Sequence, residues 1–155
     1  MTHLTNLSSI TEIIEQYIKN ANNPSSAIIM IGINNLASIN ERFGFNAGND
    51  IIKAQAKKLR SLTSSNVLLA KGEGDTFIMF VKEFKTEAEV DMLAHTAVAI
   101  SDISLQFEGA LIASTSCAGA AIFPRDAKNA NELLKCANIA LNYVKSEKQE
   151  DYLAF

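Results

Sequence analysis

Hydrophobic and polar positions along this chain follow two spacings, one helical and one extended. Apolar side chains recur at Ile10, Ile14 and Ile18, as on one face of a helix, and Ser9 with Glu12 predicts a capping box there. The apolar run 27–33 is typical of a strand buried on both faces. The same patterns predict further helices over 36–42, 50–62, 86–103 and 131–145, and further strands over 67–70, 76–82, 105–107, 110–123 and 152–155.

The order of these elements predicts a βαββαβ core with additions. The strands 67–70 and 76–82 form a β-hairpin, because the five residues between them include two glycines. Gly44 and Gly48 are expected to bracket a loop between two helices. A crossover helix between parallel strands, together with a hairpin, is typical of ferredoxin-like sheets. We therefore expect an α/β (α+β) fold with a central mixed sheet of five or more strands, flanked by helices.

The composition excludes several classes of protein. The chain has 155 residues, of which 48% are hydrophobic and 20% charged, so it can bury one full core and is too apolar to be disordered. A net charge of −3 argues against nucleic acid as a partner, because such a partner needs a basic face. No apolar stretch could span a membrane and no signal peptide is evident. We expect a cytoplasmic location, with no membrane contact by this segment.

Cysteine and histidine do not suggest a metal or redox centre. Cys117 and Cys136 are 19 residues apart without a C-x-x-C motif, which favours two buried thiols in a reducing compartment. His3 and His95 have no acidic or thiol cluster beside them, so neither is assigned a catalytic or metal role.

Two places stand out as candidates for chemistry. One is the hairpin tip 72–75, where glycines allow backbone amides to approach a ligand and an acid could hold a cation. The other is the segment 40–49, where Asn and Gly follow the first strand, at the end of a sheet where ligands collect in open α/β folds. Each has a purely structural alternative, a tight turn for the first and helix capping for the second.

These two places belong to a longer series of motifs, and the chain resembles a GGDEF domain, the diguanylate cyclase family that joins two GTP molecules into cyclic di-GMP. The resemblance covers nearly the whole chain and implies a nucleotide-cyclase-like fold. The matching blocks are 4–9 for L-T-G-L-P-N, 31–36 for D-x-D-x-F, 39–41 for I-N-D, 43–49 for Y-G-H-x-x-G-D, 70–77 for A-R-x-G-G-D-E-F, 116–120 for S-I-G-I-A, and 133–145 for L-L-x-x-A-D-x-A-L-Y-x-A-K. The loop that gives the family its name is Gly72, Glu73, Gly74, Asp75, Thr76 and Phe77.

The departures from the family pattern concern the metal site. The resemblance implies that active members hold magnesium with an acid just after the first strand and an acid at the third position of the named loop. Here the first is Gly32, the second is kept as Asp75, and Thr76 replaces the acid at the fourth position. One carboxylate makes a poor two-metal site. We therefore expect no catalytic residues, with Asp75 as a residual metal ligand only, and a loss of roughly a thousandfold or more in rate.

The loop also carries a change of charge. Glu73 stands where the family has its first glycine, so a carboxylate faces the place where phosphate should approach. A like charge at ~5 Å in a partly dry cleft is repulsive by a few kcal/mol.

We expect only part of the nucleotide recognition implied by the resemblance to be retained. The resemblance assigns nucleotide binding to Asn40, Asn49, Gly74 and Lys145. Asn49 replaces an aspartate that would accept both donors of the guanine edge, and the mismatched donor costs ~1–3 kcal/mol in selectivity. The family's later arginine is Gln149, and its R-x-x-D inhibition motif is replaced, with Ser64 and Val67 in those places. Lys145 also has a purely structural interpretation, as a solvated cation near the C-terminus of a helix.

The sequence thus favours a single degenerate GGDEF domain over 1–155, excised from a longer multidomain signalling protein. We expect a catalytically inactive regulatory, nucleotide-sensing or interaction module, beside an EAL phosphodiesterase or sensor domain in the same chain. GTP or another nucleotide, and a second copy in a homodimer, are the other partners. No cofactor is required, and Mg²⁺ matters only for residual activity. The alternatives are a divergent active cyclase, with Asn34, Asp50 or Glu73 as the missing metal ligand, and an interaction domain that binds no nucleotide.

Overall fold

The computed structural model describes residues 5–20, 25–147 and 151–155, which form five helices and seven strands. The helices are α1 (Leu7–Asn20), α2 (Leu36–Phe43), α3 (Phe45–Arg60), α4 (Glu87–Ile100) and α5 (Ala130–Glu147). The strands are β1 (Ser26–Ile33), β2 (Val67–Lys71), β3 (Phe77–Val81), β4 (Ile103–Phe107), β5 (Ala110–Ser114), β6 (Ser116–Phe123) and β7 (Tyr152–Ala154). Within these ranges no helix is long and apolar enough to cross a membrane.

The central sheet has five strands in the order β2-β3-β1-β6-β7. Neighbouring strands are antiparallel except for β6 and β7, which are parallel, so the sheet is mixed. Because β1 and β2 are both antiparallel to β3, they run parallel to each other and α3 lies on the crossover between them. This confirms the βαββαβ core and the closing edge strand.

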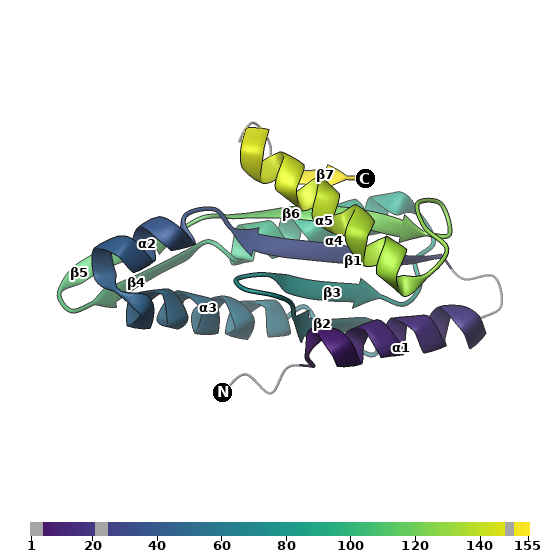
Figure 1. Ribbon diagram of the computed structural model, residues 1–155, viewed down its shortest axis with the longest axis horizontal. Helices are drawn as coiled ribbons and strands as arrows, with labels where there is room; N and C mark the ends of the chain where they lie inside the picture. The colour runs from purple at the N-terminus through teal and green to yellow at the C-terminus, as the bar shows by residue number, and fades with distance from the viewer. Residues whose placement is uncertain (1–4, 21–24, 148–150) are drawn as a thin grey trace.

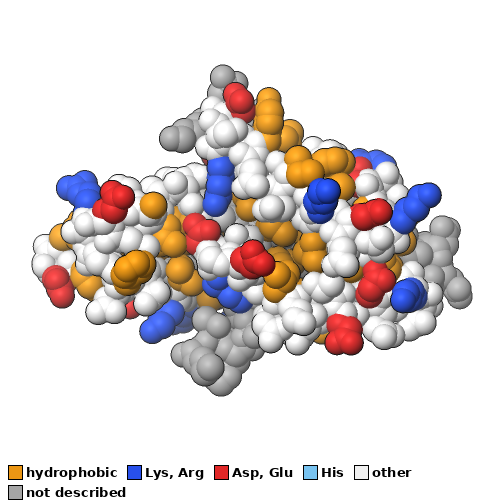
Figure 2. Space-filling model, in the orientation of Figure 1, with side chains coloured by type: hydrophobic (Ala, Val, Ile, Leu, Met, Phe, Trp, Pro, Cys, Tyr) orange, Lys and Arg blue, Asp and Glu red, His pale blue; other side chains and the backbone are white. Residues whose placement is uncertain are grey.

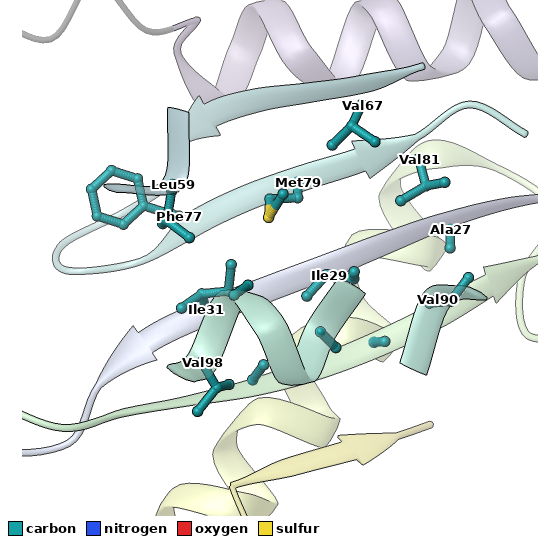
Figure 3. Close-up of a cluster of buried hydrophobic side chains, with 14 of the residues drawn as sticks. Ala27, Ile29, Ile31, Leu59, Val67, Phe77, Met79, Val81, Val90 and Val98 are labelled. Atoms are coloured by element: carbon teal, nitrogen blue, oxygen red, sulfur yellow. The ribbon is translucent and has the colours of Figure 1, made fainter. Parts of the chain in front are cut away.

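Helices cover both faces of the sheet (Figure 1). Alternate residues of β1 point to opposite sides, and all eight of its residues are buried. Ile29 and Ile31 pack with residues of α3 and α4, in the cluster drawn in Figure 3. Ile28 and Met30 pack with residues of α1 and α5 on the other face. The buried apolar run thus becomes the middle strand of a three-layer structure.

A second, two-stranded sheet of β4 and β5 lies at one end of the molecule, beside α2 and α3 (Figure 1). Ile33 from the end of β1, Ile51 of α3 and Ile112 of β5 belong to one small buried cluster there. Hydrogen bonds attach the start of α2 to the same sheet: the Asn35 side-chain amide donates to the carbonyl oxygen of Ala113 at 3.0 Å. This packing fixes the direction in which the chain leaves β1.

The structure corrects several predicted boundaries. Residue Gly48 does not end a loop but lies inside α3, which begins at Phe45 rather than at residue 50. The Asn6 side chain, not a Ser9–Glu12 box, caps α1 by accepting a hydrogen bond from the Ser9 backbone N–H at 2.8 Å. The predicted strand 110–123 is two strands, β5 and β6, interrupted at Thr115. The helix predicted over 86–103 ends at Ile100, and β4 begins at Ile103.

Candidate functional site

The connection between β2 and β3 is a tight five-residue loop. The Gly72 backbone N–H donates to the carbonyl oxygen of Thr76 at 2.8 Å, and the Thr76 N–H donates to that of Glu73 at 3.1 Å. Gly74 has a φ of 60°, in the left-handed region that favours glycine. Phe77 is fully buried at the start of β3 and anchors the loop to the core. The loop therefore presents Glu73 and Asp75 from a fixed turn.

The side chain of Lys71 stabilises this turn through hydrogen bonds to its backbone. Its ammonium donates to the carbonyl oxygens of Gly72, at 3.2 Å, and Gly74, and it lies 5.6 Å from the centre of the Phe77 ring. Burial lowers the pKa of Lys71, while the negative charge of Asp75 opposes that shift. The donors of Lys71 are thus directed at the backbone of the loop, and its role is to shape the turn.

Lys145, near the end of α5, reaches back over the sheet to the same aspartate. Its ammonium nitrogen lies 3.9 Å from Oδ1 of Asp75, and the two side chains are only 30% and 24% exposed. A Cβ atom built on Gly32 would lie 2.8 Å from Cε and 3.0 Å from Nζ of Lys145. The lysine tip therefore occupies the space where a side chain at position 32 would begin.

Cys117 lies directly beneath this arrangement, because β6 places it opposite Gly32. Burial raises the pKa of the Cys117 thiol to about 11, although the positive charge of Lys145 opposes the shift. At neutral pH this thiol is protonated and inert, as the sequence predicts for a buried cysteine. Cys136, also a free thiol, is half-buried on α5.

These residues do not fit the divalent metal that the resemblance implies. Asp75 is a single carboxylate that already faces Lys145, and in the described residues no three His, Cys, Asp or Glu side chains gather to hold a metal. A divalent ion on Asp75 would lie within about 4 Å of that ammonium, a repulsion on the order of 8 kcal/mol at an effective dielectric constant of about 20. The lysine would have to leave before a metal could bind.

The three residues considered as replacements for the missing metal ligand are either hydrogen-bonded to another residue or exposed to solvent. The Asn34 side-chain amide donates to Oγ1 of Thr115 at 3.0 Å, which ties the end of β1 to the start of β6. Asp50 is an exposed residue of α3, and Glu73 is exposed at the tip of the loop.

The positions to which the resemblance assigns nucleotide binding, Asn40 and Asn49, lie on α2 and α3, which follow the end of β1. Oδ1 of Asn40 is buried and has no hydrogen-bond partner among the described residues. It lies over Gly48, where an added Cβ would be 1.9 Å away, so a side chain at position 48 would require the Asn40 side chain to move. Asn49 is exposed on α3.

The predicted site residues thus form two groups. Gly32, Gly74, Asp75 and Lys145 are connected through the hairpin loop and the tip of the lysine, whereas Asn40 and Asn49 belong to the helix pair after β1. The prediction for Gln149 lies outside the described residues, as do Leu4 of the first motif and His3. His95 packs edge-on against the Tyr152 ring at 5.1 Å.

Sequence reasoning missed a pocket on the other side of the loop. It has a volume of about 370 Å³ between α1, the loop and α5, and Figure 2 shows a hollow with hydrophobic side chains at its floor on this face. Met30 and Ile78 line its inner part, and Asn131, Lys135 and Asn138 line the α5 side. The sequence feature that could have indicated this pocket is the spacing of these three polar residues along one side of α5. The same spacing is typical of a helix face exposed to solvent.

Comparisons with known proteins agree with the resemblance. The family profile described as "Diguanylate cyclase, GGDEF domain" matches residues 1–151. The chain is 22% identical over 148 residues to the cyclic di-GMP phosphodiesterase NbdA of Pseudomonas aeruginosa, covering 94% of this chain and 19% of NbdA. It is 24% identical over 115 residues to diguanylate cyclase A of Treponema denticola, covering 74% of this chain and 31% of that protein.

Solved structures show the same fold. The crystal structure of the GGDEF domain of YfiN (TpbB) from P. aeruginosa matches with a TM-score of 0.92 and 20% identity, covering 99% of this chain and 98% of that one. A sensory box/GGDEF family protein from Caulobacter crescentus matches with a TM-score of 0.86 and 25% identity, covering 93% and 94%.

The fold and the hairpin loop define a protein of the nucleotide-cyclase-like α/β class. The family match extends over nearly the whole sequence, and the chain belongs to the GGDEF family. The family acts in cyclic-di-GMP signalling, and the proteins similar to this chain include both cyclases and phosphodiesterases by name. The chain spans about a fifth of the length of the first curated relatives it matches.

Proposed function

We propose that this chain is a catalytically inactive GGDEF domain that senses a nucleotide and regulates a neighbouring domain in cyclic-di-GMP signalling. The observation that carries the proposal is the charge around Asp75. By the resemblance, this aspartate stands at a metal position whose second acid is Gly32 here, and the ammonium of Lys145 lies 3.9 Å from its Oδ1 and next to Gly32. Phosphoryl transfer depends on charge stabilisation by the metal ions, which one neutralised carboxylate does not support.

A regulatory role beside a second domain is supported by the nature of the relatives. The similar proteins include a bifunctional diguanylate cyclase/cyclic di-GMP phosphodiesterase, MucR of P. aeruginosa, and a crystal structure described as an EAL/GGDEF domain protein from M. capsulatus. A domain that retains the fold and keeps only one of the two metal acids is able to change shape or affinity on binding a nucleotide without consuming it. We propose an EAL or sensor domain in the same chain as the element that it regulates.

The test is direct. The purified chain is incubated with GTP and either Mg²⁺ or Mn²⁺, and the products are separated by chromatography, with an active diguanylate cyclase in the same buffer as the positive control. We expect no cyclic di-GMP above background. The proposal fails if the chain forms cyclic di-GMP at a rate near that of the control and the Asp75→Ala variant abolishes it.

A further inference from the structure

The Lys145 ammonium has unused hydrogen-bonding capacity. It carries three N–H donors, yet no hydrogen bond from it is recorded among the described residues, and its nearest anionic atom is Oδ1 of Asp75 at 3.9 Å. Its side chain is 30% exposed, so it is held close to the loop but remains accessible. An ammonium in this state is able to receive an anion without first breaking a short ion pair.

The unused hydrogen-bonding capacity is specific to Lys145, because Lys71, the other lysine at this loop, has its donors engaged. Lys71 donates to two backbone carbonyls of the loop and is positioned over the Phe77 ring. Lys145 approaches from α5 across Gly32, where the missing side chain leaves room for its tip. Lys71 is therefore a structural cation, and Lys145 is the one available to a ligand.

We propose that the Lys145 ammonium takes over the position of the divalent metal, so that this site binds the phosphates of a nucleotide in their metal-free form. The inference rests on the proposed function and names its ligand class. Lys145 supplies the positive charge that a metal would otherwise bring, and the charge of Asp75 at 3.9 Å favours keeping the lysine tip beside the loop.

This arrangement reverses the usual preference for a metal-bound nucleotide. A nucleotide that carries Mg²⁺ brings a divalent ion toward Lys145, whereas a metal-free polyphosphate brings only negative charge. The lysine therefore discriminates between the two forms by electrostatics. Neutralising the phosphates with metal should therefore not strengthen the complex.

The first test is calorimetric titration of the 155-residue chain with GTP, once in EDTA and once in excess Mg²⁺. We expect binding in EDTA to be at least as tight as in Mg²⁺. The Lys145→Met variant should bind tenfold or more weakly in EDTA, whereas Lys128→Met, which removes the same charge from an exposed position before α5, should not change the affinity. Far-UV circular dichroism confirms that each variant is folded.

A second test uses the metal alone. Titration with Mn²⁺, followed by electron paramagnetic resonance, should detect no specific binding to the wild-type chain or to the Gly32→Asp variant. The double variant Gly32→Asp, Lys145→Met should gain binding, because two carboxylates then face each other without the ammonium between them. Specific Mn²⁺ binding by the wild-type chain would overturn the inference.

The outcomes separate this inference from the proposed function. Tighter GTP binding in Mg²⁺ than in EDTA overturns the inference, and so does an unchanged affinity in Lys145→Met or the absence of GTP binding in both buffers. None of these results involves formation of cyclic di-GMP, so each leaves the assignment of an inactive domain standing, although the absence of GTP binding also removes GTP as the nucleotide that the domain senses. Formation of cyclic di-GMP overturns both.

Discussion

Two glycines of neighbouring strands, Gly119 of β6 and Gly32 of β1, offer a matched test of how α5 rests on the sheet. Both are buried in strand interiors, and neither has a positive φ. An added Cβ on Gly119 would lie 2.3 Å from the backbone N of Leu141, 2.7 Å from the backbone O of Ala137 and 2.8 Å from the backbone C of Ala140. All three neighbours are helix backbone, which has no rotamer to change.

The expected cost of Gly119→Ala follows from these distances. Ordinary contacts begin near 3.4 Å, so the helix must move by about 1 Å, and overpacking of this kind costs about 1–3 kcal/mol or more. The smaller conformational entropy of the unfolded alanine chain offsets about 0.4–1 kcal/mol. A net loss of about 1–2 kcal/mol lowers the Tm of a domain of this size by roughly 2–8 °C.

The same substitution at Gly32 should behave differently. Its Cβ would meet Cε and Nζ of Lys145 at 2.8 and 3.0 Å, and these atoms form the flexible end of a side chain. The lysine tip is able to swing aside, so Gly32→Ala should change stability by less than about 1 kcal/mol in either direction.

Thermal unfolding and urea denaturation, followed by circular dichroism, compare the two variants with the wild-type chain. Two results would refute the reasoning: a Gly119→Ala variant with an unchanged Tm, or a Gly32→Ala variant that loses as much stability as Gly119→Ala. Either would mean that the contact between α5 and the sheet is not set by the missing side chain at position 119.

Three further predictions concern individual side chains. Because burial raises its thiol pKa to about 11, Cys117 should resist iodoacetamide at pH 8 until the chain unfolds, whereas the half-buried Cys136 should be labelled faster, as peptide mass spectrometry can show. A hydrogen bond from the Thr86 backbone N–H lowers the pKa of the Glu89 carboxyl in the folded chain. The contribution of Glu89 to folding stability is therefore complete above the ordinary carboxyl pKa of 4.5 and is lost as the pH falls through the lower pKa of the folded state. In urea titrations, Glu89→Gln should reduce the dependence of stability on pH in this acid range. Arg125 donates two hydrogen bonds to the carboxylate of the adjacent aspartate, at 2.9 and 3.0 Å. A lysine cannot form this two-point contact, so Arg125→Lys should lower the free energy of unfolding by about 1 kcal/mol, nearly as much as Arg125→Met. An Arg125→Lys variant with full stability in denaturation experiments would contradict this.

The core of the fold could be predicted from the sequence because its signals were local and consistent. The apolar run of β1 and the helical spacing of α1 and α5 each indicated an element and its buried side, and the structure confirms both. The start of α3 could not be predicted, because glycine inside a helix opposes local propensity. Gly48 is tolerated there because it faces Asn40 across a close helix contact, which is a tertiary effect.

The break between β5 and β6 depends on an equally distant contact. The backbone N–H of Thr115 donates to Oδ1 of Asn35 at 3.3 Å, and the carbonyl oxygen of Thr115 accepts the Asn34 backbone N–H at 2.9 Å. These partners are 80 residues away in the sequence. The three consecutive hydroxyl residues 114–116 marked the place, but they are also common within strands.

The position of Lys145 results from a chain of contacts that no single motif contains. Register pairing sets Gly32 opposite Cys117, two residues before Gly119 on the same strand. Gly119 lets the backbone of α5 approach β6 at Leu141, and Lys145 is one helical turn beyond that point. A side chain at position 119 would lift the helix, and a side chain at position 32 would displace the lysine tip. The same small residues that allow α5 to lie close to the sheet therefore also place a positive charge beside Asp75, so the space left by glycine at position 32 is occupied by the lysine tip.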